Sequence, residues 1–122
     1  MRVRDLQLCP ELGVVGFRLA EETVLLEHQD WLRLAALPRD TVLTVGTSGG
    51  WRVPVVVHAS WGNAVLARLV VGASGSEQVQ YRSQDRFDLT RANLRKVPRR
   101  GRFRRGRPEP VLPAVEDVLE RG

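Results

Sequence analysis

The sequence predicts a mainly β fold, a small, partly open barrel or sandwich of five to seven short strands with one short helix. Three observations predict it. Short runs rich in Val, Leu and Thr recur along residues 14–97, and clusters of Gly, Ser and Asn separate them at intervals of about ten residues. Polar and apolar residues also alternate over residues 78–82. The alternative is a mixed α+β layer with the helix packed on one face of a sheet.

The first predicted element is a β-hairpin. Residues 14–19 and 23–26 are short, largely apolar stretches, and a few mostly polar residues lie between them. Two such stretches close together in the sequence are typical of paired antiparallel strands.

A short helix is predicted over residues 30–37. Trp31, Leu34 and Leu37 recur at a spacing of three, as one face of a helix requires. Asp30 is the expected N-cap, and Pro38 is expected to end the helix. No second helix is expected in the first hundred residues.

Residues 42–97 are predicted to form strands joined by turns. The expected strands are 42–45, 51–58, 64–71 and 78–82, with alternation continuing over 87–89 and a last strand at 93–97. The glycine-rich stretches 46–50 and 72–75 lack the lysine and hydroxyl of a phosphate loop, so we expect hairpin turns there. Pro54 has no N–H to donate to a ladder, which predicts that its strand is an edge or carries a bulge.

The chain is expected to form one globular domain over residues 1–97, followed by a flexible basic arm at 98–110 and a short docking helix or tail at 111–122. The arm has too few apolar side chains to fold alone. Val115, Val118 and Leu119 lie at helical spacing, but about two turns of helix are marginal without a surface to dock on. That surface is the chain's own domain or a partner protein.

Charge is distributed unevenly along the chain. Residues 1–61 carry six basic and seven acidic residues, a net of −1, whereas residues 62–122 carry thirteen and seven, a net of +6. Such asymmetry favours a polyanionic partner, either nucleic acid or an anionic membrane surface. The arm lacks the apolar face of an interfacial helix, which favours nucleic acid. Genome base composition explains the excess of arginine over lysine equally well, but not its clustering.

The basic arm is the strongest candidate binding element. Nine of the seventeen residues from 91 to 107 are basic and none is acidic. Arginines suit phosphate contact, and the one aromatic of the arm suits stacking on an unpaired base. Prolines and glycines interrupt the arm and disfavour a recognition helix, so RNA or another single strand is preferred over duplex DNA. The candidate nucleic-acid-binding residues are Arg91, Arg95, Lys96, Arg99, Arg100, Arg102, Phe103, Arg104, Arg105 and Arg107.

A second candidate surface combines aromatic and basic residues of the globular domain. Single-strand-binding barrels use exposed aromatics as stacking platforms. A tryptophan beside a turn can instead cap a small core, and the arm can instead be a solvated tail. The candidate contacts of this surface are Trp51, Trp61, Tyr81, Arg82 and Arg86.

No catalytic, metal-binding or cofactor-binding residues are predicted. His28 and His58 are the two histidines, and neither has a cysteine pair or second histidine at metal-ligand spacing. Cys9 has no histidine beside it in any nucleophile motif. Asp85 and Asp88 fit no nuclease motif, and Asp88 is expected to cap a turn.

These observations favour a non-catalytic nucleic-acid-binding protein. The alternatives are an adaptor protein, whose basic arm and tail helix engage an acidic partner, and a small ribonuclease-like enzyme. No apolar run reaches the length of about 18 residues that a membrane helix needs, and the N-terminus lacks signal-peptide features. We therefore expect a cytoplasmic protein with no membrane association, and the oligomeric state is left open.

Overall fold

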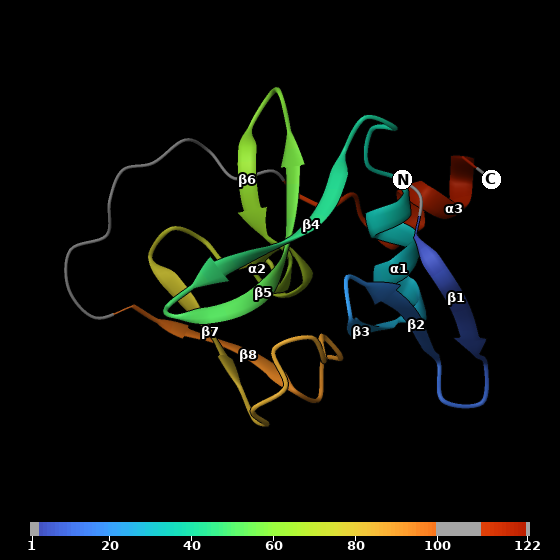
Figure 1. Ribbon diagram of the computed structural model, residues 1–122. Helices are drawn as coiled ribbons and strands as arrows, with labels where there is room; N and C mark the ends of the chain where they lie inside the picture. Colours follow the sequence, from blue (N-terminus) through green and yellow to red (C-terminus); the bar gives the residue numbers. More distant parts are fainter. Residues whose placement is uncertain (1–2, 100–110, 122) are drawn as a thin grey trace.

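The computed structural model describes residues 3–99 and 111–121, and this part of the chain is mainly β (Figure 1). Its eight strands form three small antiparallel sheets, more strands than the five to seven predicted. The mainly β prediction is confirmed. The sheets do not close into a barrel, which fits a partly open sandwich. No helix of the described residues is long and apolar enough to cross a membrane.

The first sheet has the order β1-β2-β3, with β1 at Arg4–Cys9, β2 at Val14–Leu19 and β3 at Glu22–Glu27. The predicted hairpin is confirmed as β2 and β3. Phe17 lies opposite Val24 in the ladder, and both side chains are buried. The sequence analysis did not predict β1, because its apolar alternation spans only Leu6 and Leu8. All six of its residues are exposed.

The predicted helix is confirmed as α1 (His28–Ala35), which lies two residues earlier at each end. The prediction that Asp30 caps it is wrong. The N-cap position belongs to Glu27, whereas Asp30 lies in the first turn and is fully buried. Its carboxylate instead accepts hydrogen bonds from the guanidinium groups of Arg33 and Arg91. Trp31 packs on the ring of Phe17, with ring centroids 5.6 Å apart.

The second sheet has the order β4-β5-β6, with β4 at Val42–Ser48, β5 at Trp51–His58 and β6 at Gly62–Val65. Gly49 and Gly50 form the tight turn between β4 and β5, with φ of 59° and 84°. These left-handed conformations favour glycine, as the sequence predicted. Strand β4 extends further than expected. All five residues of the glycine-rich stretch 46–50 were assigned to the turn, but the first three belong to the strand.

The strand that contains Pro54 is central in this sheet, and its ladders show no register shift. The prediction that this strand is an edge or carries a bulge is therefore wrong. The pairing around Pro54 itself explains why a proline is tolerated in this strand. The ladder between β5 and β6 runs from Val55 to His58, and Pro54 is paired with Val45 of β4 alone. A residue without an N–H is tolerated where a ladder is present on one side only.

The apolar run at residues 64–71 is only partly a strand. Its last six residues form helix α2 (Leu66–Val71), so the prediction of a single helix in the first hundred residues is wrong. A short run that is apolar on every side does not distinguish a buried strand from a buried helix. Gly72 ends α2 with a φ of 68°, a left-handed conformation typical of helix C-termini.

The third sheet pairs β7 (Glu77–Tyr81) with β8 (Leu94–Pro98), which confirms two predicted strands. The expected alternation at 87–89 does not give a strand. It gives a single parallel bridge to Leu25 of β3, whose N–H donates to the carbonyl of Phe87 at 3.0 Å and whose carbonyl accepts from the N–H of Leu89 at 2.9 Å. This bridge ties the loop before β8 to the first sheet.

The segment after the arm packs on the same core as the sheets. Leu112 is 3% exposed and belongs to the main apolar cluster. The Arg33 Nε donates to the carbonyl oxygen of Pro113 at 2.9 Å. Helix α3 (Val115–Arg121) then lies beside α1 (Figure 1). The two ends of the arm are therefore both attached to the globular part.

Replacing Leu112 with alanine is expected to lower the free energy of unfolding by about 2 kcal/mol, because it removes buried methyl groups from the core. Urea unfolding of the full chain measures this. Val111→Ala is the matched control, since its side chain is 84% exposed and its loss is expected to change little. Equal effects of the two substitutions would show that the tail is not part of the core.

Candidate functional site

A cleft of about 440 Å³ lies between the β4–β5 hairpin, α2 and β7. Five of its lining side chains are basic or aromatic, and none of the described residues that line it is acidic. We call it the arginine cleft. Its basic and aromatic lining residues are Trp51, Arg68, Tyr81, Arg86 and Arg99.

Arg86 is the centre of the arginine cleft. Its guanidinium carbon lies 4.1 Å from the centroid of the Trp51 ring and 4.5 Å from that of Tyr81. Both distances are within the range of cation–π attraction. Its Nη1 also donates to the carbonyl of Ser83 at 3.1 Å. Three of the five residues predicted for the domain surface are thus brought together from β5, β7 and the loop before β8.

Arg68 and Arg99 provide the other two positive charges. Arg68 donates from Nη1 to the carbonyl of Glu77 and from Nη2 to that of Ser74, each at 2.7 Å, and so joins α2 to the turn before β7. The backbone N–H of Arg99 donates to the carbonyl of Ser76 at 2.8 Å. The arm therefore begins at the rim of the cleft. Arg68 was missed by the sequence analysis, although it is the one charged residue in the apolar run 64–71.

Burial raises the pKa of the Tyr81 phenol, and the positive charge of Arg86 opposes part of this rise. Between the unfolded and the folded pKa the folded state holds the phenol proton and the unfolded state loses it. The contribution of Tyr81 to stability is therefore fully present below about pH 10 and declines as the pH rises through the folded pKa.

An absorbance titration of the phenolate is expected to give a midpoint for the folded protein above that of the denatured chain. Tyr81 is the one tyrosine of the sequence, so the signal has a single source. The same titration in denaturant is the control. Coincident midpoints would contradict the half-buried position of the Tyr81 ring.

Arg95 and Lys96 are exposed on β8, the strand that leads to the arm. Arg95 donates from Nε and Nη2 to the Oε1 of Gln80 at 3.0 and 2.8 Å, and Gln80 in turn lines the arginine cleft. Their role in binding stays a prediction. The other predicted arm contacts lie outside the described residues, namely Arg100, Arg102, Phe103, Arg104, Arg105 and Arg107.

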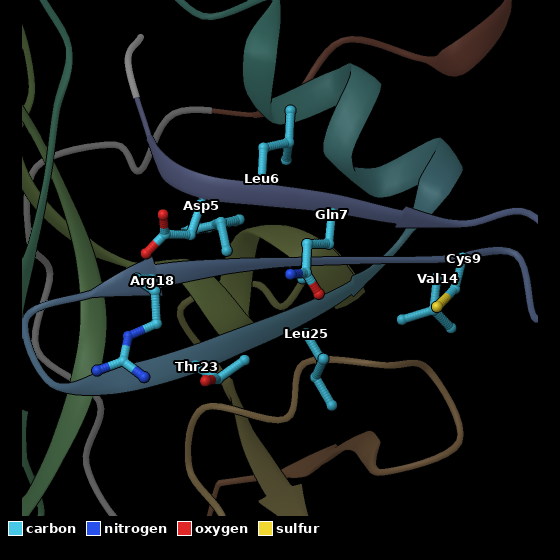
Figure 2. A pocket seen from close by; sticks show the side chains of 10 residues that line it. Asp5, Leu6, Gln7, Cys9, Val14, Arg18, Thr23 and Leu25 are labelled. Atoms are coloured by element: carbon cyan, nitrogen blue, oxygen red, sulfur yellow. The ribbon is translucent and has the colours of Figure 1, made fainter.

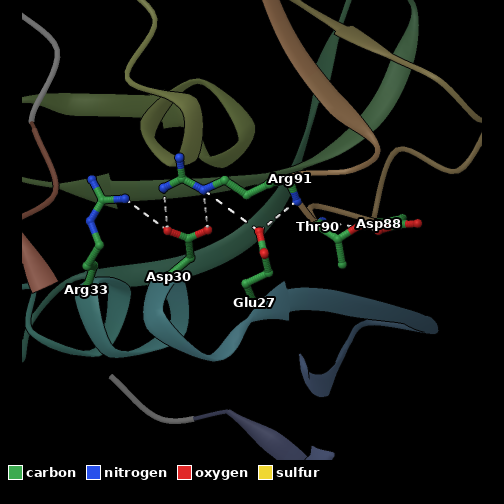
Figure 3. Close-up of polar contacts among 6 residues, drawn as sticks. All are labelled: Glu27, Asp30, Arg33, Asp88, Thr90 and Arg91. Atoms are coloured by element: carbon green, nitrogen blue, oxygen red, sulfur yellow. Dashed lines mark hydrogen bonds and ion pairs between the residues drawn. The ribbon is translucent and has the colours of Figure 1, made fainter. Parts of the chain in front are cut away.

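Arg91 is committed to a contact within the fold (Figure 3). Its Nε and Nη2 donate to the two carboxylate oxygens of Asp30 at 3.0 and 2.8 Å, and its backbone N–H donates to Glu27 at 2.9 Å. The hydrogen bonds to Asp30 are the largest cause of a raised Arg91 pKa, and burial partly opposes them. We therefore leave Arg91 out of the proposed interface.

Two members of the predicted domain surface lie apart from the arginine cleft. Trp61 is half-buried, packs against the core and stacks on the ring of His58 with centroids 5.6 Å apart. The alternative that a tryptophan beside a turn caps a small core describes it well. Arg82 is exposed, its backbone N–H donates to the carbonyl of Asn93, and it does not line the cleft.

A second cleft of about 510 Å³ lies over the first sheet (Figure 2). Asp5 and Arg18 lie toward one end of it, and Cys9 and Val14 toward the other. A third, of about 290 Å³, shares Trp51 and Arg86 with the arginine cleft and includes two acidic residues. Both contain carboxylates, so neither has the uniformly positive lining that a polyanion requires.

The acidic residues considered for catalysis serve local turns. The Asp85 carboxylate accepts from the backbone N–H of Phe87 at 2.9 Å. Asp88 accepts from the N–H and the hydroxyl of Thr90 at 3.1 and 2.7 Å, which confirms that it caps a turn. Over residues 3–99 and 111–121, no group of three or more His, Cys, Asp and Glu side chains is placed to hold a metal ion.

A scan against protein-family models gives no match, and searches of curated proteins and of solved structures give no significant one. Function is therefore inferred from the chain's own residues.

Proposed function

We propose that this chain is a non-catalytic nucleic-acid-binding protein that contacts phosphates through its arginine-rich arm and through the arginine cleft where the arm begins. One observation carries the proposal. Arg68, Arg86 and Arg99 line a single cleft, no acidic residue lines it within residues 3–99 and 111–121, and the arm starts from its rim. RNA or another single strand is the preferred ligand.

The division of roles follows from charge and geometry. Arginine side chains in the arm neutralise phosphates and release counterions, which produces affinity that decreases steeply with salt. Such contacts position the strand without reading its sequence. The cleft supplies positive charges next to aromatic faces, so it is the part of the protein that can distinguish one nucleic-acid structure from another.

The adaptor alternative is less well supported. It requires the tail helix to dock in the groove of a partner protein. Leu112 is instead buried in the chain's own core, and α3 lies beside α1. Leu119 is 64% exposed, but it is a single residue of a short helix.

Fluorescence anisotropy of the full chain with a labelled single strand and a labelled duplex, across a salt series, tests the proposal. Submicromolar binding at low salt that weakens linearly on a log–log scale is the expected result. The full chain is required, because a chain ending at residue 97 also loses Leu112 from the core. If the protein binds neither the single strand nor the duplex at low salt, the proposal is wrong.

A further inference from the structure

We propose that the arginine cleft accepts one unpaired base, which stacks on Trp51 beside Tyr81 while Arg86 turns to the adjoining phosphate. The inference rests on the proposed function and names the class of ligand, a single strand. The first observation behind it is the exposure of the Trp51 side chain. Trp51 lies at the first position of β5 and is 46% exposed, although nothing in the hairpin turn requires an aromatic there.

Arg86 shows that a flat group fits over these rings. Its planar guanidinium lies 4.1 Å from the centroid of Trp51 and 4.5 Å from that of Tyr81. A nucleobase is also a flat group that stacks on aromatic faces, and it does so whatever its sequence. Cation–π contacts at partly exposed rings are weak, so a base can displace the guanidinium with little loss.

The surroundings of the rings match the other parts of a nucleotide. Arg68 and Arg99 place positive charge on the same cleft for the phosphates on either side of the base.

A duplex does not satisfy this arrangement. Its bases are paired and stacked on one another, so their faces do not reach a tryptophan at the wall of a cleft without unstacking. Its phosphates still attract the arm and the cleft arginines. The inference therefore separates the two ligands: the ring of Trp51 contributes to single-strand binding and not to duplex binding.

The test compares Trp51→Leu and Trp51→Phe in the full chain, with a labelled deoxythymidine homopolymer and a duplex of matched charge. Trp51→Leu is expected to weaken single-strand binding about tenfold and to leave duplex binding within about twofold. Trp51→Phe keeps an aromatic face and is expected to retain most of the single-strand affinity. Unfolding curves of both variants verify that the fold is unchanged.

Two results would overturn the inference. One is unchanged single-strand affinity in Trp51→Leu, and the other is an equal loss for both ligands. In either case the unsubstituted protein still binds and the proposed function stands. If the unsubstituted protein binds neither ligand at low salt, the proposed function and this inference fail together.

Discussion

Replacing Arg91 with alanine is expected to lower the free energy of unfolding by about 3 kcal/mol. The reason lies in Asp30, whose side chain is fully buried while that of Arg91 is 44% exposed. Without Arg91, one carboxylate oxygen of Asp30 loses its guanidinium partner, and only the Arg33 Nη1 contact at 2.9 Å is left on the other (Figure 3). A buried charge that loses its partner is strongly destabilising.

Two further variants show that the loss comes from the buried charge. Arg95→Ala removes an arginine of the same stretch whose bonds to Gln80 are exposed, and an effect below about 1 kcal/mol is expected. Adding Asp30→Asn to Arg91→Ala removes the unpaired charge and is expected to recover part of the stability. Denaturant unfolding measures all three. If Arg91→Ala is no worse than Arg95→Ala, the pair does not stabilise the fold.

Replacing the five arginines of residues 100–107 with glutamine is expected to reduce the salt dependence of single-strand binding by about 3.5 in log–log slope. Each phosphate contact on a single strand contributes about 0.7, and five contacts are removed. The variant keeps Leu112 and α3 in the chain, so its unfolding curve is expected to match that of the unsubstituted protein. The substituted residues are Arg100, Arg102, Arg104, Arg105 and Arg107.

The matched control replaces the same five arginines with lysine, which keeps each positive charge and removes the planar fork. Its salt slope is expected to equal that of the unsubstituted arm. A slope unchanged by glutamine would place the phosphate contacts outside the arm. Equal loss with lysine and with glutamine would show that geometry rather than charge controls binding.

The elements that the sequence predicted well are those with a local pattern. The β2–β3 hairpin shows two short apolar stretches, α1 shows apolar residues at a spacing of three, and β7 shows alternating polar and apolar residues. A short segment is enough to display each of these patterns. Strand β1, whose residues are all exposed, was missed because its apolar alternation spans only Leu6 and Leu8. Helix α2 was missed because its run is apolar on every side, and burial in the finished fold, not the local pattern, decides between strand and helix there.

The candidate site also has a part that the sequence determines and a part that depends on the tertiary structure. The sequence by itself determined the clustering of positive charge after residue 90, the mainly β class and the kinds of side chain available for stacking. Only the tertiary structure decided that Arg86 lies over Trp51 and Tyr81, and that Arg91 instead neutralises Asp30, which lies 61 residues away in the chain. Both pairings depend on the loop that β3 holds through Leu25, a long-range contact that no local periodicity encodes. Charge density is a property of composition, whereas the partner of each charge is set by packing.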